Sequence, residues 1–121
     1  MSQSDRSTRI GAMVFPERSN HYHTLMGGQT LSMLDVAAFV AASRVARCHL
    51  VTAGAGDIRF LKPVPEGHFV EAVAEAITAE GKGWQVAVAL ESECLLTGTR
   101  RRCAEGRFVF VPRPESPPGA S

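Results

Sequence analysis

The sequence predicts an α+β protein in which one long, apolar helix is wrapped by antiparallel strands. The helix is expected over residues 29–48, which contain neither Gly nor Pro and are rich in Ala, Leu and Met, residues that favour helix. The segments after it alternate apolar and polar residues and are separated by Gly-containing turns, which is typical of strands joined by hairpins. Apolar residues also cover nearly the whole circumference of the helix, so one contact face would leave much of it in water. The sheet is therefore expected to curl around the helix.

The composition indicates one domain. Of the 121 residues, we expect 9–112 to form this domain, 1–8 to be a flexible N-terminus and 113–121 to be a disordered, Pro-rich tail. A formal net charge of +1 gives no reason to expect nucleic acid or an anionic membrane as a partner. No apolar run is long enough to cross a bilayer, and the first residues lack the apolar core of a signal peptide. Cys48, Cys94 and Cys103 are odd in number and widely spaced, which predicts reduced thiols in a cytoplasmic protein.

The elements that flank the helix are short. A strand over residues 9–15 is stopped by Pro16, and residues 19–28 form an irregular segment rich in His and Gly. After the helix, a short apolar piece at 50–53 is expected to be broken by Gly54-Ala55-Gly56. A strand at 57–61 and a turn at 62–67 follow.

The second half of the chain contains one ambiguous segment. Residues 68–80 fit a helical stripe, and propensity alone chooses helix there, although the same residues alternate equally well as a strand. A turn at 81–83 leads into a clear strand at 84–95, and a final strand covers 107–111.

Asp35 is the only charged residue in the apolar run 33–42 of the predicted helix. A carboxylate there loses hydration on folding unless it is paired, hydrogen-bonded or protonated. It either serves structure, by facing a wet groove or bonding to backbone, or serves function. The residue alone leaves these two interpretations equally open.

Several short motifs together resemble the hotdog-fold acyl-CoA thioesterases, in particular the cytosolic acyl-CoA hydrolase type. The motifs are Asn20 to Gly27-Gly28 with Leu31 and Leu34-Asp35, residues 51–53, 57–60 and 62–64, Gly67, the strand from Trp84, and residues 106–111. Each is weak alone, but their order and spacing over residues 10–112 are fairly specific.

The resemblance implies the hotdog fold, with a curved antiparallel sheet around one long central helix, and it implies that residues 68–80 form a strand. In this family two protomers join their sheets side by side, with active sites at the interface, and such dimers often assemble further into tetramers or hexamers. The chain departs from the family at the Gly81-Lys82-Gly83 turn, where one or two Ser or Thr residues usually follow the Gly. Met26 and His68 also replace the usual aromatic and small acidic residues.

The family's activity is hydrolysis of acyl-CoA to the free acid and CoA, which needs a nucleophile, a base and donors for the developing oxyanion. The N–H of Gly28, with that of Gln29, suits the last role because helix N-termini carry free N–H groups and partial positive charge. Asp35 lies on nearly the same face of the helix but roughly 10 Å from Gly28, so a site combining them is expected to use two protomers. Asp35 would then act as general base or as nucleophile. Asn20 would orient the water or the carbonyl, whereas without the family it is more simply a turn residue.

Several further residues are expected to line the substrate site. Coenzyme A is part of the substrate, no separate cofactor is expected, and its phosphates call for cations. The candidates for the phosphates are Arg59, Lys62 and Lys82, with Gly83 offering backbone contacts, and Lys82 and Gly83 rank first because they lie where the family's cofactor loop lies. His23, Thr24 and Gly27 are expected to shape or line the pocket beside the helix start. The run Arg100-Arg101-Arg102 is better explained as a solvated hairpin end. His21 and His23 lack the further ligands that a metal site needs.

Two alternatives remain beside the thioesterase. A hotdog hydratase or dehydratase usually pairs a His with a carboxylate, which His23 or His21 near Asp35 could imitate. A non-catalytic module that binds or senses acyl-CoA would need the pocket without the carboxylate, and the retention of Asn20 and Asp35 argues against it.

Overall fold

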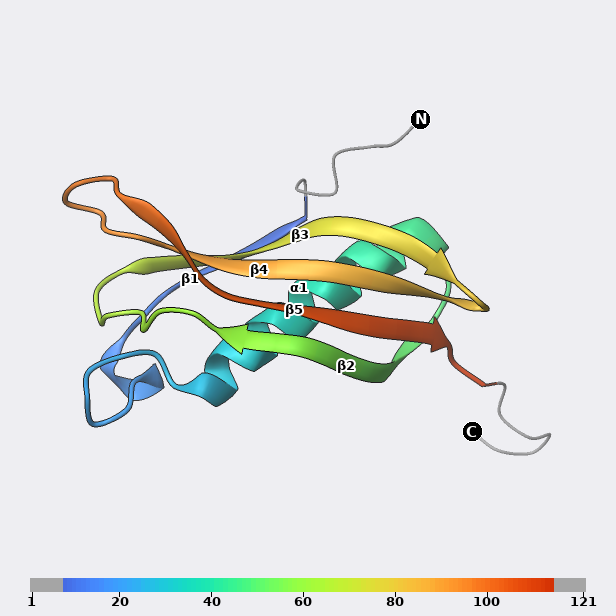
Figure 1. The fold of residues 1–121 in the computed structure, drawn as a ribbon, viewed down its shortest axis with the longest axis horizontal. Coiled ribbons are helices and arrows are strands. Elements are labelled where there is room, and N and C mark those ends of the chain that lie inside the picture. Colours follow the sequence, from blue (N-terminus) through green and yellow to red (C-terminus); the bar gives the residue numbers. More distant parts are fainter. Residues whose placement is uncertain (1–7, 115–121) are drawn as a thin grey trace.

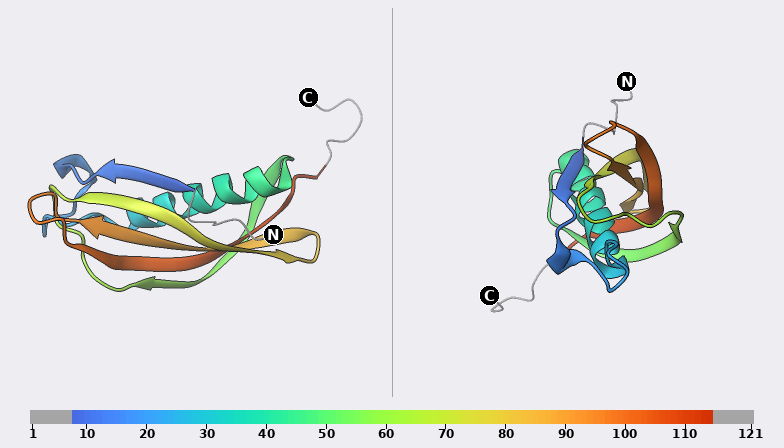
Figure 2. Two further views of the ribbon diagram at one scale, coloured as in Figure 1. Left: turned by 90° about the horizontal axis from the view of Figure 1, so that it is seen from above. Right: turned by 90° about the vertical axis from the view of Figure 1, so that its left-hand side faces the viewer.

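The computed structural model describes residues 8–114, and its elements form a single sheet with one long helix on its concave side (Figures 1 and 2). In chain order they are β1 (Arg9–Met13), the 3-10 turn η2 (Pro16–Arg18), α1 (Gly27–Ala46), β2 (Leu50–Phe60), β3 (Phe69–Glu80), β4 (Gly83–Glu93) and β5 (Arg100–Pro112). The strands are antiparallel and lie in the order β1-β3-β4-β5-β2, so that β1 and β2 are the two edges. The expected architecture, a curved antiparallel sheet around a central helix, is confirmed.

One face of α1 packs against the middle of the sheet. Small residues dominate this face, including Ala37, Ala38 and Ala41, and all three are almost completely buried. Short side chains let the helix backbone approach the sheet closely, and the larger Leu34 fills the space between them. On the sheet side, Phe110 is fully buried and its ring meets that of Phe39 edge to face at 5.8 Å between centroids.

The opposite face of α1 differs from the prediction. The helix was expected to be buried on most sides, but within one chain Val36 and Phe39 are exposed on the outer face, Val36 by 45%. A single five-stranded sheet covers only the helix stripe that faces it, which explains the difference. Next to this outer face, Asp35 contacts Thr52 of the edge strand β2, so this side of the helix borders an open sheet edge.

The ambiguous segment 68–80 is a strand, as the resemblance implies and against local propensity. β3 bonds to β1 on one side and to β4 over its whole length on the other, from Phe69 opposite Glu93 to Glu80 opposite Gly83. Partners on both edges supply the hydrogen bonds and packing that decide the outcome, because strand preference depends strongly on such context.

Two predictions of strand limits were wrong. Gly54 and Gly56 do not interrupt the strand, because β2 is continuous from Leu50 to Phe60. Its pairing with β5 instead shifts register at two points, between Thr52 and Gly54 and between Gly56 and Arg59. An edge strand tolerates such bulges because only one side must match a partner. The last strand is also longer than expected, since β5 starts at Arg100 rather than at 107.

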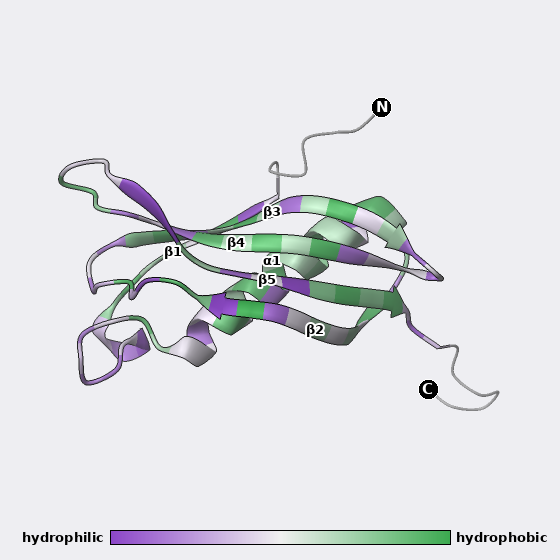
Figure 3. Ribbon diagram, viewed as in Figure 1, coloured by the Kyte–Doolittle hydropathy of each residue, from purple (hydrophilic) through white to green (hydrophobic). Residues whose placement is uncertain are grey.

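The early part of β5 pairs with β4, from Arg100 opposite Glu93 to Arg102 opposite Glu91, and its Arg side chains form ion pairs on the outer face of the sheet. Arg100 contacts Glu91 and Glu93 on the neighbouring strand β4, and Glu71 on β3, one strand further across the sheet. Arg102 pairs with Glu75 and with Glu105. The purple start of β5 in Figure 3 marks this Arg-rich segment. The Arg run is therefore the exposed first end of β5 at the β4–β5 hairpin, as expected, and ion pairs join it to the sheet.

Other predictions concern parts of the chain at or beyond the described range. Residues 1–7 and 115–121, which include most of both predicted tails, lie outside it. Within residues 8–114 no helix is both long and apolar enough to span a membrane. The same range holds no group of three side chains placed to bind a metal ion.

Candidate active site

The N-terminus of α1 offers unpaired backbone donors. The first helical hydrogen bond runs from the N–H of Thr30 to the carbonyl of Met26, so the N–H groups of residues 27–29 precede it. No side chain caps this end of the helix. A Cβ added to Gly28 would meet nothing within 4 Å, so the backbone there is open to an approaching molecule. This geometry suits the predicted carbonyl clamp at Gly28 and Gln29.

Asp35 lies in the third turn of α1, half-buried, beside the edge strand β2. The hydroxyl of Thr52 donates to its Oδ1 over 3.4 Å. The carboxylate is thus neither enclosed in the core nor unpartnered, and it lies at the border between the covered and the exposed stripes of the helix. A group in this position is accessible from the exposed side of the helix.

Asn20 organises the loop that leads into the helix. Its Oδ1 accepts hydrogen bonds from the N–H of Tyr22 at 2.9 Å, and from the N–H and the hydroxyl of Thr24 at 3.2 and 3.1 Å. The interpretation of Asn20 as a turn residue is therefore correct. Its side-chain oxygen is committed to the loop, which leaves the amide nitrogen as the group that could donate to a bound molecule.

His23 belongs to the same loop but faces a different carboxylate. It has a positive φ of 63°, and its Nδ1 lies 3.2 Å from Oε2 of Glu66. The N–H of Glu66 also bonds to the carbonyl of His23. These contacts tie the loop to the turn before β3, so His23 shapes the site and has a carboxylate partner other than Asp35.

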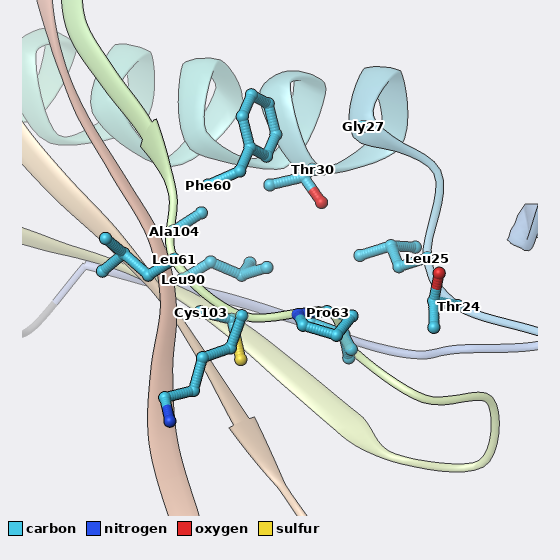
Figure 4. Close-up of a pocket in the computed structure, with 12 residues that line it drawn as sticks. Thr24, Leu25, Gly27, Thr30, Phe60, Leu61, Pro63, Leu90, Cys103 and Ala104 are labelled. Atoms are coloured by element: carbon cyan, nitrogen blue, oxygen red, sulfur yellow. The ribbon is translucent and has the colours of Figure 1, made fainter. Parts of the chain in front are cut away.

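A cavity of about 310 Å³ opens beside the helix N-terminus (Figure 4). It lies between the first turn of α1, the end of β2 and strands β4 and β5. Three of the predicted site residues line it, namely Thr24, Gly27 and Lys62. Most of the remaining lining is apolar, with Leu90 and Ala104 at the buried floor and Phe60 and Leu61 at the exposed rim. Arg59 is exposed on β2 next to this rim.

Lys82, in the turn between β3 and β4, and Gly83, the first residue of β4, lie at the other end of the molecule (Figure 1). That turn is near the C-terminal end of α1, and a helix of 20 residues is about 30 Å long. Gly83 also has a structural reason for being glycine, because an added Cβ would overlap the carbonyl oxygen of Phe110. Within one chain these two residues are not brought together with the helix N-terminus.

Thr52 was not among the predicted site residues. In the sequence Thr52 is one hydroxyl residue in an apolar strand. Its separation of 17 positions from Asp35 corresponds to no contact within a single helix or strand. Only the packing of β2 beside α1 joins them. The resemblance included residues 51–53 as a motif, which was the one available signal.

Comparisons with known proteins agree with this fold. The profile of the Thioesterase superfamily matches residues 22–96, and the chain belongs to this superfamily. A Bacillus subtilis (strain 168) protein named uncharacterized acyl-CoA thioester hydrolase YkhA is 33% identical over 98 residues, which cover 81% of this chain. The chain spans 57% of the length of that relative.

Two solved structures extend the comparison. An acyl-CoA hydrolase from Bacillus cereus is 33% identical with a TM-score of 0.83, over 87% of this chain and 64% of that one. An acyl-CoA hydrolase from Staphylococcus aureus, solved with butyryl coenzyme A, coenzyme A and coenzyme A disulfide, is 27% identical with a TM-score of 0.80, over 88% and 67%. Three variants of the Staphylococcus aureus hydrolase were also solved, in which an Asn, an Asp or a Thr is replaced by Ala. The Asp lies 15 positions after the Asn, and the Thr lies 17 positions after the Asp. Asn20, Asp35 and Thr52 have these same separations.

Proposed function

We propose that this protein is an acyl-CoA thioesterase that hydrolyses the thioester to a free acid and CoA. The observation that carries the proposal is the pair formed by Asp35 and Thr52, with Oδ1 and Oγ1 3.4 Å apart, on the exposed border of the helix. The same residue types at the same separations as in the Staphylococcus aureus hydrolase support a common site.

The proposed chemistry uses two elements. The N–H of Gly28, with that of Gln29, binds the thioester oxygen and stabilises the negative charge as the carbon becomes tetrahedral. Asp35 either takes the proton from an attacking water or attacks the carbon itself. In the first route the tetrahedral intermediate expels the CoA thiolate, which receives the proton from Asp35. In the second route the CoA thiolate leaves as Asp35 forms a mixed anhydride with the acyl group, and water then hydrolyses the anhydride to the free acid and restores the carboxylate. Asn20 positions the water or the carbonyl through its amide nitrogen.

The site is proposed to form between two copies of the chain. Gly28 and Asp35 of one chain are seven positions, about two helical turns, apart and cannot meet one carbonyl group. Val36 and Phe39 are exposed on α1, and Asp35 beside them contacts the open edge strand β2, which suits a second copy that extends the sheet and covers the helix. A homodimer of this kind, assembling further to a tetramer or hexamer, would bring Asp35 of each chain toward Gly28 of the other.

The groups proposed to hold CoA are Arg59 and Lys62, with His23 and Thr24 shaping the loop beside them. Lys82 and Gly83 lie at the opposite end of the same chain, so they would reach a bound CoA only from a neighbouring copy. The three cysteines are free thiols, which suits the expected cytoplasmic location.

The test is thiol release from acyl-CoAs of several lengths by the wild type and by Asp35→Asn. We expect the variant to remain folded and to bind CoA while turnover falls by about 100-fold or more. Near-normal turnover would remove Asp35 from the mechanism. If the wild type binds acyl-CoA without releasing thiol, the result would instead support a sensor. If it releases a hydrated product, the result would support a hydratase.

A further inference from the structure

We infer that the 310 Å³ cavity beside the helix N-terminus receives the acyl chain, and that its closed floor restricts the enzyme to short and medium straight-chain acyl groups. The inference rests on the proposed function and adds a substrate class to it. It is carried by how the cavity is built, by its size and by its position relative to the backbone donors of α1.

An irregularity in β5 builds the floor. Leu90 of β4 pairs with Ala104 and the next residue, Glu91, pairs with Arg102, so Cys103 is an extra residue in the ladder. This bulge turns both Cys103 and Ala104 inward, and each is 1% exposed and lines the cavity. The carbonyl of Cys103 also accepts the N–H groups of Leu61 and Lys62, which holds the end of β2 at the cavity wall.

The floor is closed by neighbouring core contacts. The thiol of Cys103 donates to the hydroxyl of Ser92 over 3.2 Å, and Ser92 is itself 2% exposed. Leu90 is fully buried and belongs to the same core as the helix. A chain entering from the rim therefore meets packed side chains rather than a continuing tunnel, and its length is limited by this wall.

The rim places the start of the cavity at the proposed carbonyl clamp. Gly27 lines the cavity and directly precedes Gly28, and a Cβ on Gly27 would lie 3.8 Å from the ring of Phe60. Phe60 is 59% exposed, so its ring forms a wall beside the helix rather than part of the core (Figure 4). A thioester oxygen held at the N–H of Gly28 would therefore have its acyl group at this apolar opening.

The size of the cavity sets the chain length. An apolar cavity of about 150 Å³ holds benzene, which corresponds to about 25 Å³ for each carbon. A volume of 310 Å³ then accepts at most about twelve carbons, fewer where the space near the rim stays in water. Each methylene that leaves water should raise kcat/KM by up to about fourfold until the floor is reached.

The experiment measures kcat/KM for straight-chain acyl-CoAs from two to sixteen carbons. We expect a rise with length, an optimum at or below about twelve carbons, and a fall beyond it. Cys103→Leu adds two heavy atoms to the floor and should move the optimum down by about two carbons. Cys48→Leu makes the same change at an exposed cysteine outside the cavity and should leave the profile unchanged.

A second variant protects the test if Cys103→Leu fails to fold. Phe60→Ala removes an exposed side chain and should reduce the gain per methylene, because the chain then keeps contact with water on one side. A profile independent of length, or unchanged in both variants, would overturn the inference while leaving the thioesterase intact.

If no acyl-CoA is hydrolysed, the proposed function fails and the cavity is tested by binding alone. Calorimetric titration with decanoyl-CoA should then give weaker binding to Cys103→Leu than to the wild type and to Cys48→Leu. Equal affinities for all three proteins would overturn the cavity assignment.

Discussion

Replacing Thr52 by Val tests whether this residue acts through Asp35. The substitution removes the hydroxyl that donates to Oδ1 of the carboxylate and keeps a β-branched side chain suited to a strand. Thr52 is exposed on an edge strand in the single chain, so its removal should not disturb the core. Activity, rather than folding, should therefore respond.

The geometry gives the magnitude. Hydrogen bonds to charged groups contribute about 1.5–3 kcal/mol at their usual O–H···O distances of about 2.5–3.0 Å. The distance of 3.4 Å between Thr52 Oγ1 and Asp35 Oδ1 is longer, so about 1 kcal/mol is expected, or about a fivefold loss in kcat/KM. The free energy of unfolding should change by no more than about 0.5 kcal/mol, as for other surface substitutions.

The assay is thiol release, combined with urea unfolding, for Thr52→Val, Asp35→Asn and the double variant. If Thr52 acts by positioning the carboxylate, adding Thr52→Val to Asp35→Asn should cost nothing further. Thr78→Val, at an exposed position of β3, is the control for loss of a strand hydroxyl. A fivefold loss that persists in the Asp35→Asn background, or wild-type activity in Thr52→Val, would refute the reasoning.

Three other predictions concern packing, assembly and thiol chemistry. Gly83→Ala should lower the free energy of unfolding by about 2–3 kcal/mol, because the new Cβ meets the carbonyl of Phe110, whereas Gly27→Ala should be near neutral in the same urea titration. Val36→Glu should shift the oligomer toward monomer in a sedimentation experiment. Leu96→Glu, at a hairpin position that is 96% exposed, is the control and should leave the oligomer unchanged. An oligomer unchanged by both substitutions would exclude the helix face from the interface. The hydroxyl and the N–H of Thr97, with the N–H of Leu96, lower the pKa of the Cys94 thiol. At neutral pH iodoacetamide should therefore label Cys94 faster than Cys48, as followed by mass spectrometry. Thr97→Val should slow the labelling of Cys94.

The predictions about the loop before the helix had a mixed outcome. The pairing of an Asn with Gly27-Gly28 pointed to this region, and the structure does bring Thr24, Gly27 and Lys62 to one cavity. It also shows that the oxygen of Asn20 is used within the loop. The roles of these residues in binding or catalysis stay predictions.

The sequence by itself determined the elements whose signals are local. Composition without Gly or Pro predicted the long helix, alternation predicted β4, and Gly81 marked the turn between β3 and β4. The Gly-Gly pair at the helix start was readable for the same reason, since free N–H groups at a helix N-terminus follow from helix geometry alone.

Only the tertiary structure decided what depends on neighbours distant in the chain. Residues 69–80 form a strand because β1 and β4 bond to both of its edges, and β2 runs through its glycines because β5 supplies a partner. The contact between Asp35 and Thr52 arises from the packing of β2 beside α1, and the cavity whose floor is the bulge at Cys103 arises from the packing of α1, β2, β4 and β5. Such contacts have no period in the sequence, because they follow from how the sheet curves around the helix rather than from any local preference.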